Sequence, residues 1–383
     1  MSSQKFKVQN TNSVYPTGYV SSPDKGLLII VLFLALIGLM MILSAGASKC
    51  VALGVNPGSF AVKQLFWFVM GLFGLTFFTK YDYKKLEKIA VPFAWAVVFF
   101  LILINFTSMG VIVNGAKRWL ALGPFQFQPS EMTKPALALL LACAFKNDIV
   151  IFNQDKMVKY FLPIVCMAGL TAAQPNLSMV IIMGLVSLIM YIAAGGSIRM
   201  LLTMACAAFG VLELKIKPYQ MSRIKVWLNP ETDPYGGGYN IIQSLLAFVS
   251  GGFFGVGFGN SKQKLEWLPE AHTDFIYAVI GEEWGFLGCL AIIWLFLWFV
   301  FRGLKVALSC KNMFGKLLAT GLTCSIGCQA FINMSVASSF VPATGVPMPF
   351  ISYGGTSLFV TMCMVGVILN ISKMRIIRNN RNV

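Results

Sequence analysis

The sequence predicts an all-α polytopic membrane protein with ten transmembrane helices. The chain of 383 residues is 57% hydrophobic and 11% charged, whereas soluble globular domains are roughly 25% charged. Apolar runs of about twenty residues, each long enough to cross ~30 Å of hydrocarbon, recur along the whole chain. The charged residues stand mainly between these runs, which is the arrangement expected of loops that leave the bilayer.

The apolar runs predict ten spans and two short tails. The spans are expected at residues 26–47, 61–79, 89–106, 129–145, 160–174, 177–194, 199–214, 275–301, 314–338 and 354–372. Residues 1–24 are polar and without periodicity, so we expect a disordered tail, and residues 373–383 form a short basic tail. The membrane domain then covers residues 25–372. An even number of spans places both termini on one side of the membrane.

Charge asymmetry predicts the orientation. Most of the 30 Lys and Arg fall in the tails and loops on the side of the termini, and the positive-inside rule makes that side cytoplasmic. The cations form no arm or stripe, so the net charge of +16 does not indicate nucleic-acid binding. The nine cysteines include no C-x-x-C pair, which argues against a disulfide framework or a zinc site.

Several cations remain on the predicted outer face, against the topological rule. They include Lys117 and Arg118, which precede Trp119 in the loop from 107 to 128, and Arg223 and Lys264 in a long extracellular loop between spans seven and eight. Long loops are partly exempt from the rule, which accounts for Arg223 and Lys264. It does not account for Lys117 and Arg118.

The fourth span begins with an unusual set of polar residues. Gln128, Glu131 and Lys134 are three residues apart, so a helix places them on one face. An acid and a base inside a membrane helix are costly unless they face a partner or a wet cavity. The spacing therefore fits either a structural Glu131–Lys134 ion pair or a site.

The long loop before span eight also has a distinctive pattern. Tyr239 to Val249 is apolar but about half a span long, which indicates a re-entrant or interfacial segment. Residues 251–259 are glycine-rich and allow close backbone approach, which at membrane depth requires packing against protein or a cavity. After span nine, the prolines of residues 342–349 predict a rigid outer loop.

Asp274 stands at the predicted mouth of span eight, two residues after His272, the only histidine. A carboxylate at this boundary, with cations on the same side, could act as a base on a membrane-bound substrate. The simpler interpretation is that Thr273 or Asp274 caps the helix. Glu282 and Glu283 lie about two turns further along and fit either a cavity or structural hydrogen bonds.

Five motifs, in this order and at these span positions, resemble the SEDS (shape, elongation, division and sporulation) family, which includes FtsW, RodA and SpoVE, and FtsW most closely. They are Asn114-Gly-Ala-Lys-Arg-Trp119, Gln128-Pro-Ser-Glu131 with Lys134, Gly238-Tyr-Asn-Ile-Ile-Gln-Ser-Leu245, Pro269-Glu-Ala-His-Thr-Asp-Phe275 with Gly281-Glu-Glu283, and Pro342 to Gly355. The resemblance covers residues 25–372.

The resemblance implies a GT-C-like peptidoglycan glycosyltransferase of the bacterial cytoplasmic membrane. Such an enzyme polymerises lipid II and works with a class B penicillin-binding protein and other division or elongation proteins. The essential aspartate of the family corresponds to Asp274 and its outer-loop tryptophan to Trp119, while its polar residues on the fourth span correspond to Gln128, Glu131 and Lys134. We add His272 and Ser352, which lie in matching motifs, to the expected substrate contacts.

One departure concerns the turn between spans five and six. Family members usually read Gln-Pro-Asp-Leu-Gly, whereas this chain has Asn176 at the aspartate position. An amide brings no negative charge to a metal, so no metal ligand is predicted. A magnesium or manganese requirement stays open.

The expected mechanism uses Asp274 as general base toward a sugar hydroxyl, with outer cations meeting the charge of the leaving diphosphate. Lys134 and Arg118 rank first among those cations, followed by Lys117, Arg223 and Lys264, and Trp119 would cover the lipid entrance or stack on a sugar. Two other functions remain open. One is a lipid II flippase, and the other is a scaffold without catalytic activity. The sequence does not distinguish division from elongation or sporulation.

Overall fold

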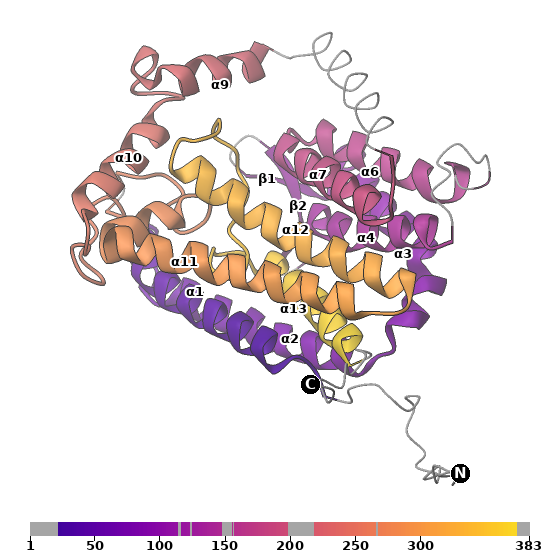
Figure 1. Ribbon diagram of the computed structural model, residues 1–383. Helices are drawn as coiled ribbons and strands as arrows, with labels where there is room; N and C mark the ends of the chain where they lie inside the picture. The colour runs from indigo at the N-terminus through magenta and orange to yellow at the C-terminus, as the bar shows by residue number, and fades with distance from the viewer. Residues whose placement is uncertain are drawn as a thin grey trace, which may run out of the picture.

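A computed structural model describes residues 22–113, 116–122, 125–147, 155, 157–197, 218–265 and 267–373. Its main body is a helical bundle (Figure 1). The bundle helices are α1 (Lys25–Ala52), α2 (Ser59–Lys80), α3 (Tyr83–Phe106), α4 (Thr133–Phe145), α6 (Leu162–Ala173), α7 (Leu177–Ala193), α11 (Ile276–Ser309), α12 (Met313–Ala337) and α13 (Gly355–Ser372). Within the described residues, six are long and apolar enough to cross a membrane: α1, α2, α3, α11, α12 and α13.

The predicted spans match these helices in position, with differences at their ends. Helix α3 begins at Tyr83 rather than 89, because the Asp82 carboxylate caps it by accepting from the N–H of Lys84 at 3.0 Å. Spans four, five and six correspond to shorter helices, with a 3₁₀ turn η1 (Pro129–Met132) before α4 and a π-helical turn η2 (Met157–Phe161) before α6. The predicted seventh span and both tails except residues 22–24 and Lys373 lie outside the described residues.

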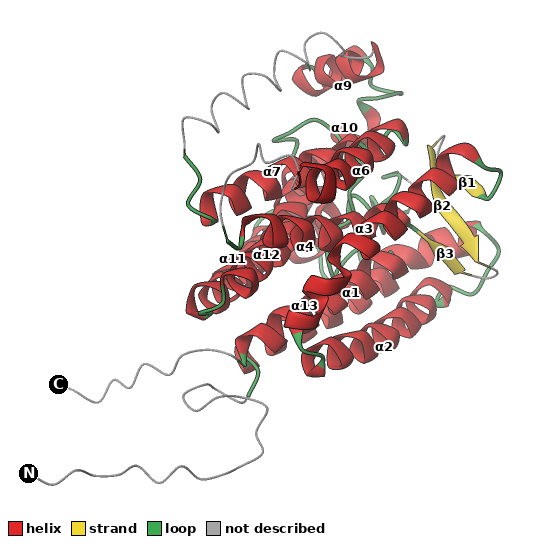
Figure 2. Ribbon diagram, turned by 90° about the vertical axis from the view of Figure 1, so that its right-hand side faces the viewer, coloured by secondary structure: helices red, strands yellow, loops and turns green. Residues whose placement is uncertain are grey.

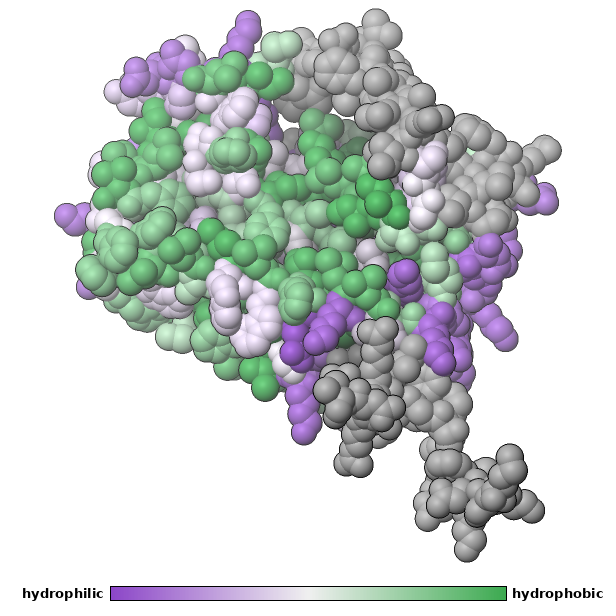
Figure 3. Space-filling model, viewed as in Figure 1, coloured by the Kyte–Doolittle hydropathy of each residue, from purple (hydrophilic) through white to green (hydrophobic). Residues whose placement is uncertain are grey.

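Helix α12 is the centre of the bundle and packs against α4, α7, α11 and α13. Small residues permit the close approach: a Cβ on Gly321 would lie 2.5 Å from the sulfur of Met190 on α7. By contrast, α2 and α3 expose many large apolar side chains. The surface over α11 and α12 is largely hydrophobic, and hydrophilic residues gather toward the ends of the helices (Figure 3). This pattern is that of helices surrounded by lipid.

Both ends of the membrane domain lie at one end of the bundle. The Asp24 carboxylate caps α1 and accepts from Arg302 Nη2 at 2.5 Å, while the Asp24 N–H donates to Ser372 Oγ at 2.9 Å. The first and last described helices of the chain therefore meet at this end of the bundle. We call the opposite end, where α1 finishes and α11 begins, the distal end.

A small antiparallel sheet lies at the distal end, so the all-α prediction was wrong for the described residues 110–113, 116–122 and 125–127. Strands β1 (Gly110–Val113), β2 (Ala116–Leu122) and β3 (Phe125–Phe127) pair in the order β1-β2-β3, with a bulge between Val111 and Ile112 (Figure 2). The β-branched run of β1 and the Asn-Gly dipeptide that follows it in the sequence are a strong hairpin signal. Each strand is too short for the apolar patterning that predicts transmembrane spans.

The long loop before α11 contains α9 (Pro218–Leu228), η3 (Pro230–Thr232) and α10 (Tyr239–Gly251), which packs against α11. Helix α11 is broken at Gly285, whose φ is 67°. The chain after α10 satisfies the carbonyls that the break leaves without helical partners, because the N–H groups of Val256 and Gly257 donate to the carbonyls of Glu282 and Glu283 at 3.0 and 3.1 Å. The close backbone approach predicted for residues 251–259 is confirmed, and it is made against protein as required at membrane depth.

Candidate functional site

The turn from Trp267 to Phe275 carries Asp274 at the distal end. Helix α11 begins after it without any side-chain cap, and the Thr273 hydroxyl donates to the Glu270 carboxylate at 2.6 Å instead. The capping interpretation of Thr273 and Asp274 was therefore wrong. Asn333 of α12 holds the turn by donating to the main-chain carbonyl of Asp274 at 2.7 Å. The Asp274 carboxyl takes no part in capping α11.

The Asp274 carboxyl is half-buried, and it and the Arg118 guanidinium lie beside the same side of Gly345. A Cβ on Gly345 would be 3.1 Å from Asp274 Oδ2 and 3.6 Å from Arg118 Nη1. Burial and the nearby Glu270 carboxylate raise the pKa of Asp274 to about 7, against the opposing charge of Arg118. An acid with this pKa is about half ionised near neutral pH, which suits a group that takes up and releases a proton.

Arg118 is oriented by main-chain carbonyls of the α6–α7 turn. Its Nε donates to Gln174 at 3.1 Å and its Nη2 to Pro175 at 2.5 Å. The sequence predicted this turn, and Asn176 follows in it with a buried side chain. These contacts bring the strand β2, the α6–α7 turn and the Asp274 turn together, although they are distant in the sequence.

The other two residues of the predicted outer-loop motif also lie on β2. The Lys117 ammonium donates to the carbonyl of Thr107 at 2.5 Å, at the C-terminal end of α3. This end of a helix attracts a cation, so Lys117 has a structural partner. Trp119 is half-buried and pairs with Val111 of β1. Of these three residues, only Arg118 acts electrostatically on Asp274.

The polar residues that open the fourth span form a buried network. The Lys134 ammonium lies 2.6 Å from Glu131 Oε2, and the two side chains are 1% and 0% exposed. Lys134 also donates to Gln329 Oε1 of α12, while Gln128 is buried and donates to Ser130 at 3.1 Å. The structural ion pair, one of the two predicted alternatives, is therefore formed. The ammonium we ranked first for phosphate contact is enclosed.

Lys264 likewise forms a buried ion pair within the protein. Its ammonium lies 2.7 Å from Glu283 Oε1 and donates to Ser44 of α1 at 2.8 Å. The Glu282 carboxylate accepts from the backbone N–H of Lys262 at 2.9 Å. Both glutamates are thus structural acids. The last predicted cation, Arg223, is exposed and donates to the carbonyl of Ala343 at 3.2 Å.

His272 and Ser352 connect the Asp274 turn to its surroundings. The His272 ring stacks on Phe60 with centroids 5.1 Å apart, and burial together with the charge of Lys49 lowers its pKa, against Glu270. The Ser352 hydroxyl donates to the carbonyl of Thr273 at 2.5 Å. Ser352 is buried, so the predicted substrate contact is a structural hydrogen bond here.

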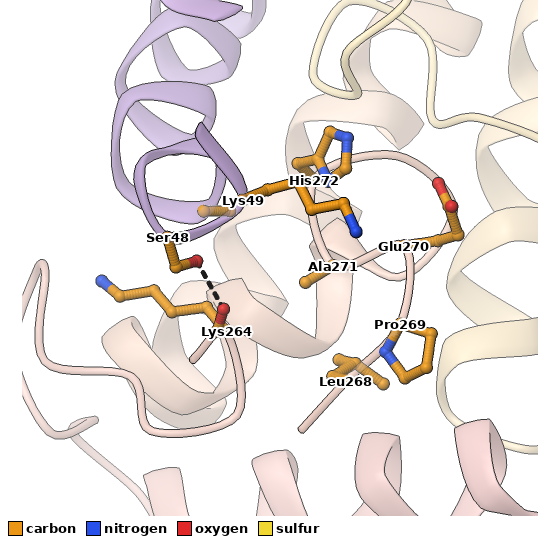
Figure 4. A pocket seen from close by; sticks show the side chains of 9 residues that line it. Ser48, Lys49, Lys264, Leu268, Pro269, Glu270, Ala271 and His272 are labelled. Carbon is orange, nitrogen blue, oxygen red and sulfur yellow. Dashed lines mark hydrogen bonds between the residues drawn. The ribbon is translucent and has the colours of Figure 1, made fainter. Parts of the chain in front are cut away.

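A cavity of about 300 Å³ opens on the other side of this turn, beside the end of α1. It is lined by Ala45, Ser48, Lys49, Lys264, Leu268, Pro269, Glu270, Ala271 and His272 (Figure 4). Glu270, which has a strained φ of 55°, lines the cavity, whereas Asp274 does not.

The described residues contain no group of three His, Cys, Asp or Glu side chains that could hold a metal ion. The donors near Asp274 are a single neighbouring carboxylate and an arginine, and arginine opposes cation binding. A single carboxylate next to an arginine does not fit a divalent cation.

Some residues of the site were not singled out from the sequence. Gly345 lies against both charged groups, and Gln329 and Asn333 hold the surrounding loops. Gln329 and Asn333 are amides four residues apart inside an apolar stretch. This spacing could have indicated a site, because polar groups in a membrane helix must find partners. Glu270 lies in the motif of residues 269–275, but no spacing or hydropathy pattern indicated that it would lie near Asp274.

The fold and site define a polytopic membrane protein with an acid–arginine pair at one end of its bundle. The family described as "Cell cycle protein" (FtsW, RodA and SpoVE) matches residues 25–376. A probable peptidoglycan glycosyltransferase FtsW of Trichlorobacter lovleyi is 38% identical over 91% of this chain and 93% of its own length. The stage V sporulation protein E of Bacillus subtilis is 35% identical over 92% and 98%.

Solved structures show the same arrangement. A chain from a peptidoglycan synthase complex that coordinates polymerization and crosslinking matches with a TM-score of 0.74 and 27% identity, over 91% of this chain and 97% of that one. A variant of the rod shape determining protein RodA from Thermus thermophilus matches with a TM-score of 0.68 and 26% identity, over 92% and 98%. The chain belongs to the FtsW/RodA/SpoVE family.

Proposed function

We propose that this protein is a peptidoglycan glycosyltransferase that polymerises lipid II at the outer face of the bacterial cytoplasmic membrane. Relatives named as probable enzymes of this kind cover nearly the whole chain, as does the chain of a peptidoglycan synthase complex. The single observation that carries the proposal is the half-buried Asp274, with its raised pKa, beside Arg118 at the distal end.

The chemistry joins a sugar hydroxyl to the anomeric carbon of a sugar that bears a polyprenyl diphosphate. The Asp274 carboxylate takes the hydroxyl proton as the new C–O bond forms, while the bond to the diphosphate breaks and its electron pair leaves with the phosphate oxygen. General base catalysis of this kind is typically worth about 10²–10⁴-fold in rate. Direct attack inverts the anomeric centre, so an α-linked donor yields a β-linkage.

The leaving diphosphate needs positive charge in its path. Lys117, Lys134 and Lys264 already bind carbonyls or carboxylates in the protein. Arg118 also donates to two main-chain carbonyls, through Nε and Nη2, but of these cations it is the one that lies near Asp274, because its Nη1 and Asp274 Oδ2 border the same side of Gly345. We therefore assign the diphosphate contact to Arg118, with exposed Arg223 of α9 next to the same 342–353 loop as the second cation.

The proposal includes ten membrane spans with both termini on the cytoplasmic side. Ten spans are supported by the six long apolar helices, the shorter ones and the predicted span outside the described residues. The distal end would then be extracellular and the basic end, with Asp24 and Ser372, cytoplasmic. The likeness to a chain of a complex that couples polymerization to crosslinking supports a penicillin-binding protein as partner, in division, elongation or sporulation.

Purified protein in lipid vesicles, supplied with lipid II with and without a partner penicillin-binding protein, tests the function. We expect glycan polymer from the wild type and none from Asp274→Ala. Asp82→Ala is the matched control, because it removes a helix-capping carboxylate at the opposite end of the bundle. Movement of lipid II across the bilayer without polymer would support a flippase, and polymer from Asp274→Ala would refute the assignment of the base.

A further inference from the structure

Two amide side chains stand one helical turn apart on α12, inside the bundle. Gln329 and Asn333 are 0% and 1% exposed. Residues four apart lie on the same helix face, so both point toward the loop of residues 342–353 and the Asp274 turn. Buried amides in a membrane protein are costly unless they are hydrogen-bonded. Both amides donate hydrogen bonds, whereas Asn333 Oδ1 is buried without a hydrogen-bond partner among the described residues.

Asn333 joins the two segments that flank the candidate site. Its Nδ2 group donates to the main-chain carbonyl of Asp274 and to that of Val346, each at 2.7 Å. Val346 directly follows Gly345, the residue that lies against both the Asp274 carboxyl and the Arg118 guanidinium. The Asn333 amide nitrogen therefore links the backbone of Asp274 to the backbone of Val346, next to Gly345 and Arg118.

Gln329, one helical turn before Asn333 in α12, binds the same 342–353 loop. Its Nε2 donates to the carbonyl of Pro347 at 2.8 Å, and its Oε1 accepts from Lys134. Lys134 is bound to Glu131 at 2.6 Å. The buried Glu131–Lys134 ion pair, which joins η1 to α4, thus fixes the orientation of the Gln329 amide, since the lysine accepts no hydrogen bond and must face the oxygen.

Other contacts limit how far the loop can move, but none of those described lies so close to the acid. The Ser352 hydroxyl donates to the carbonyl of Thr273, at the far end of the loop from Gly345. The Met348 N–H donates to Ser352 Oγ at 2.7 Å and closes the loop on itself. Without Asn333, the part of the loop that contains Gly345 and Val346 loses its direct link to Asp274.

We propose that Asn333 is a positioning residue for Asp274, which holds the Asp274 turn and the 342–353 loop in register so that the carboxyl stays near Arg118 beside Gly345. The inference rests on the proposed glycosyltransferase function. It assigns Asn333 no contact with the substrate. Misplacement of a reacting group by about 1 Å costs about 10²-fold in rate, which sets the size of the expected effect.

Asn333→Leu tests this role, because leucine keeps the approximate volume and removes both donor hydrogens without adding charge. Asn370→Leu is the matched control. Asn370 is a buried asparagine, 3% exposed, that donates to the carbonyl of Thr79 at 2.9 Å and accepts from Tyr83 at 3.0 Å, at the other end of the bundle. Both variants lose two hydrogen bonds, but only one borders the site.

We expect Asn333→Leu to lower kcat for lipid II polymerisation about 30- to 100-fold, with KM within about threefold of wild type. The acid limb of its kcat–pH profile should move upward by about half a pH unit, because the Asp274 carboxyl drifts from Arg118 while Glu270 stays near. Asn370→Leu should keep the wild-type kcat per folded molecule and the wild-type profile.

Wild-type polymer with an unchanged kcat and pH profile in Asn333→Leu would overturn the positioning role, and so would equal losses in the two leucine variants. Absence of wild-type polymer would instead refute the proposed function. Should Asn333→Leu not fold, Asn333→Ala replaces it, since it also removes both donor hydrogens without adding charge. Misfolding of both would make Asn333 a stability residue and end the proposal.

Discussion

Replacing Asp274 by asparagine should abolish polymerisation and, at the same time, stabilise the folded protein above neutral pH. The structure raises the pKa of this carboxyl from 3.8 to about 7. Between these values the unfolded chain has lost the proton and the folded protein has kept it. Wild-type stability therefore falls as pH rises through this window, and the full cost is present above pH 7.

The magnitude follows from 1.36 kcal/mol per pKa unit, which gives a cost of about 4 kcal/mol as an upper bound. Because Asp274 is only half-buried, solvent screening reduces this to about 2 kcal/mol. Asparagine has no charge to bury, so Asp274→Asn should unfold about 3 °C higher than wild type at pH 8. At pH 4 the two proteins should unfold at nearly the same temperature.

The assay is thermal unfolding in lipid nanodiscs at a fixed heating rate, across pH 4 to 9, with the polymerisation rate measured on the same samples. Wild-type kcat should fall about tenfold per pH unit below pH 7, as the base becomes protonated. Asp274→Asn should lose at least about 10²-fold in kcat at pH 8. A stability difference that is independent of pH would show that Asp274 is not a carboxyl with a raised pKa.

Three further substitutions test the packing around the site. Lys134→Met should destabilise the protein by about 3–5 kcal/mol, because Glu131 is left buried without its partner; Glu131→Gln in the same chain should recover part of the loss in a thermal unfolding assay. Gly285→Ala should cost about 3 kcal/mol or more, since the residue has a φ of 67°, and folded yield measures this. Gly345→Ala should lower kcat about tenfold with little loss of stability, because its Cβ would lie 3.1 Å from Asp274 Oδ2.

The controls for these substitutions come from the same chain. Gly169→Ala in α6 has nothing within 4 Å of the added Cβ, so it should stabilise the protein by about 1 kcal/mol. Wild-type stability in Lys134→Met would show that the ion pair contributes nothing. A normal yield of Gly285→Ala, or wild-type kcat in Gly345→Ala, would contradict the close contacts at those positions.

The positions of the spans could be predicted because each must be long and apolar. Their ends were less accurate, since Asp82 begins α3 inside a charged stretch that was assigned to a loop. The sheet of residues 110–127 was missed because its strands are short, and three residues suffice for β3. Apolar patterning over a window of twenty residues does not detect elements of this size.

For the site, the sequence identified the charged residues but not where their side chains point. Glu131 and Lys134 are three residues apart, so their pairing could be foreseen. The contact of Lys264 with Ser44 joins residues 220 apart, and no local pattern indicates it. The closeness of Asp274 and Arg118 likewise depends on the tertiary packing around Gly345.

The interruption of α11 at Gly285 has a consequence for how this chain tolerates insertions and deletions. Phe286 and Leu287 donate to the carbonyls of Gly252 and Phe253 at 2.9 and 3.3 Å, so the segment after α10 is matched to α11 residue by residue. A single residue gained or lost between 251 and 257 would shift every one of these partners. The exposed stretch that follows, up to Asn260, has no such correspondence, and length changes should be accommodated there.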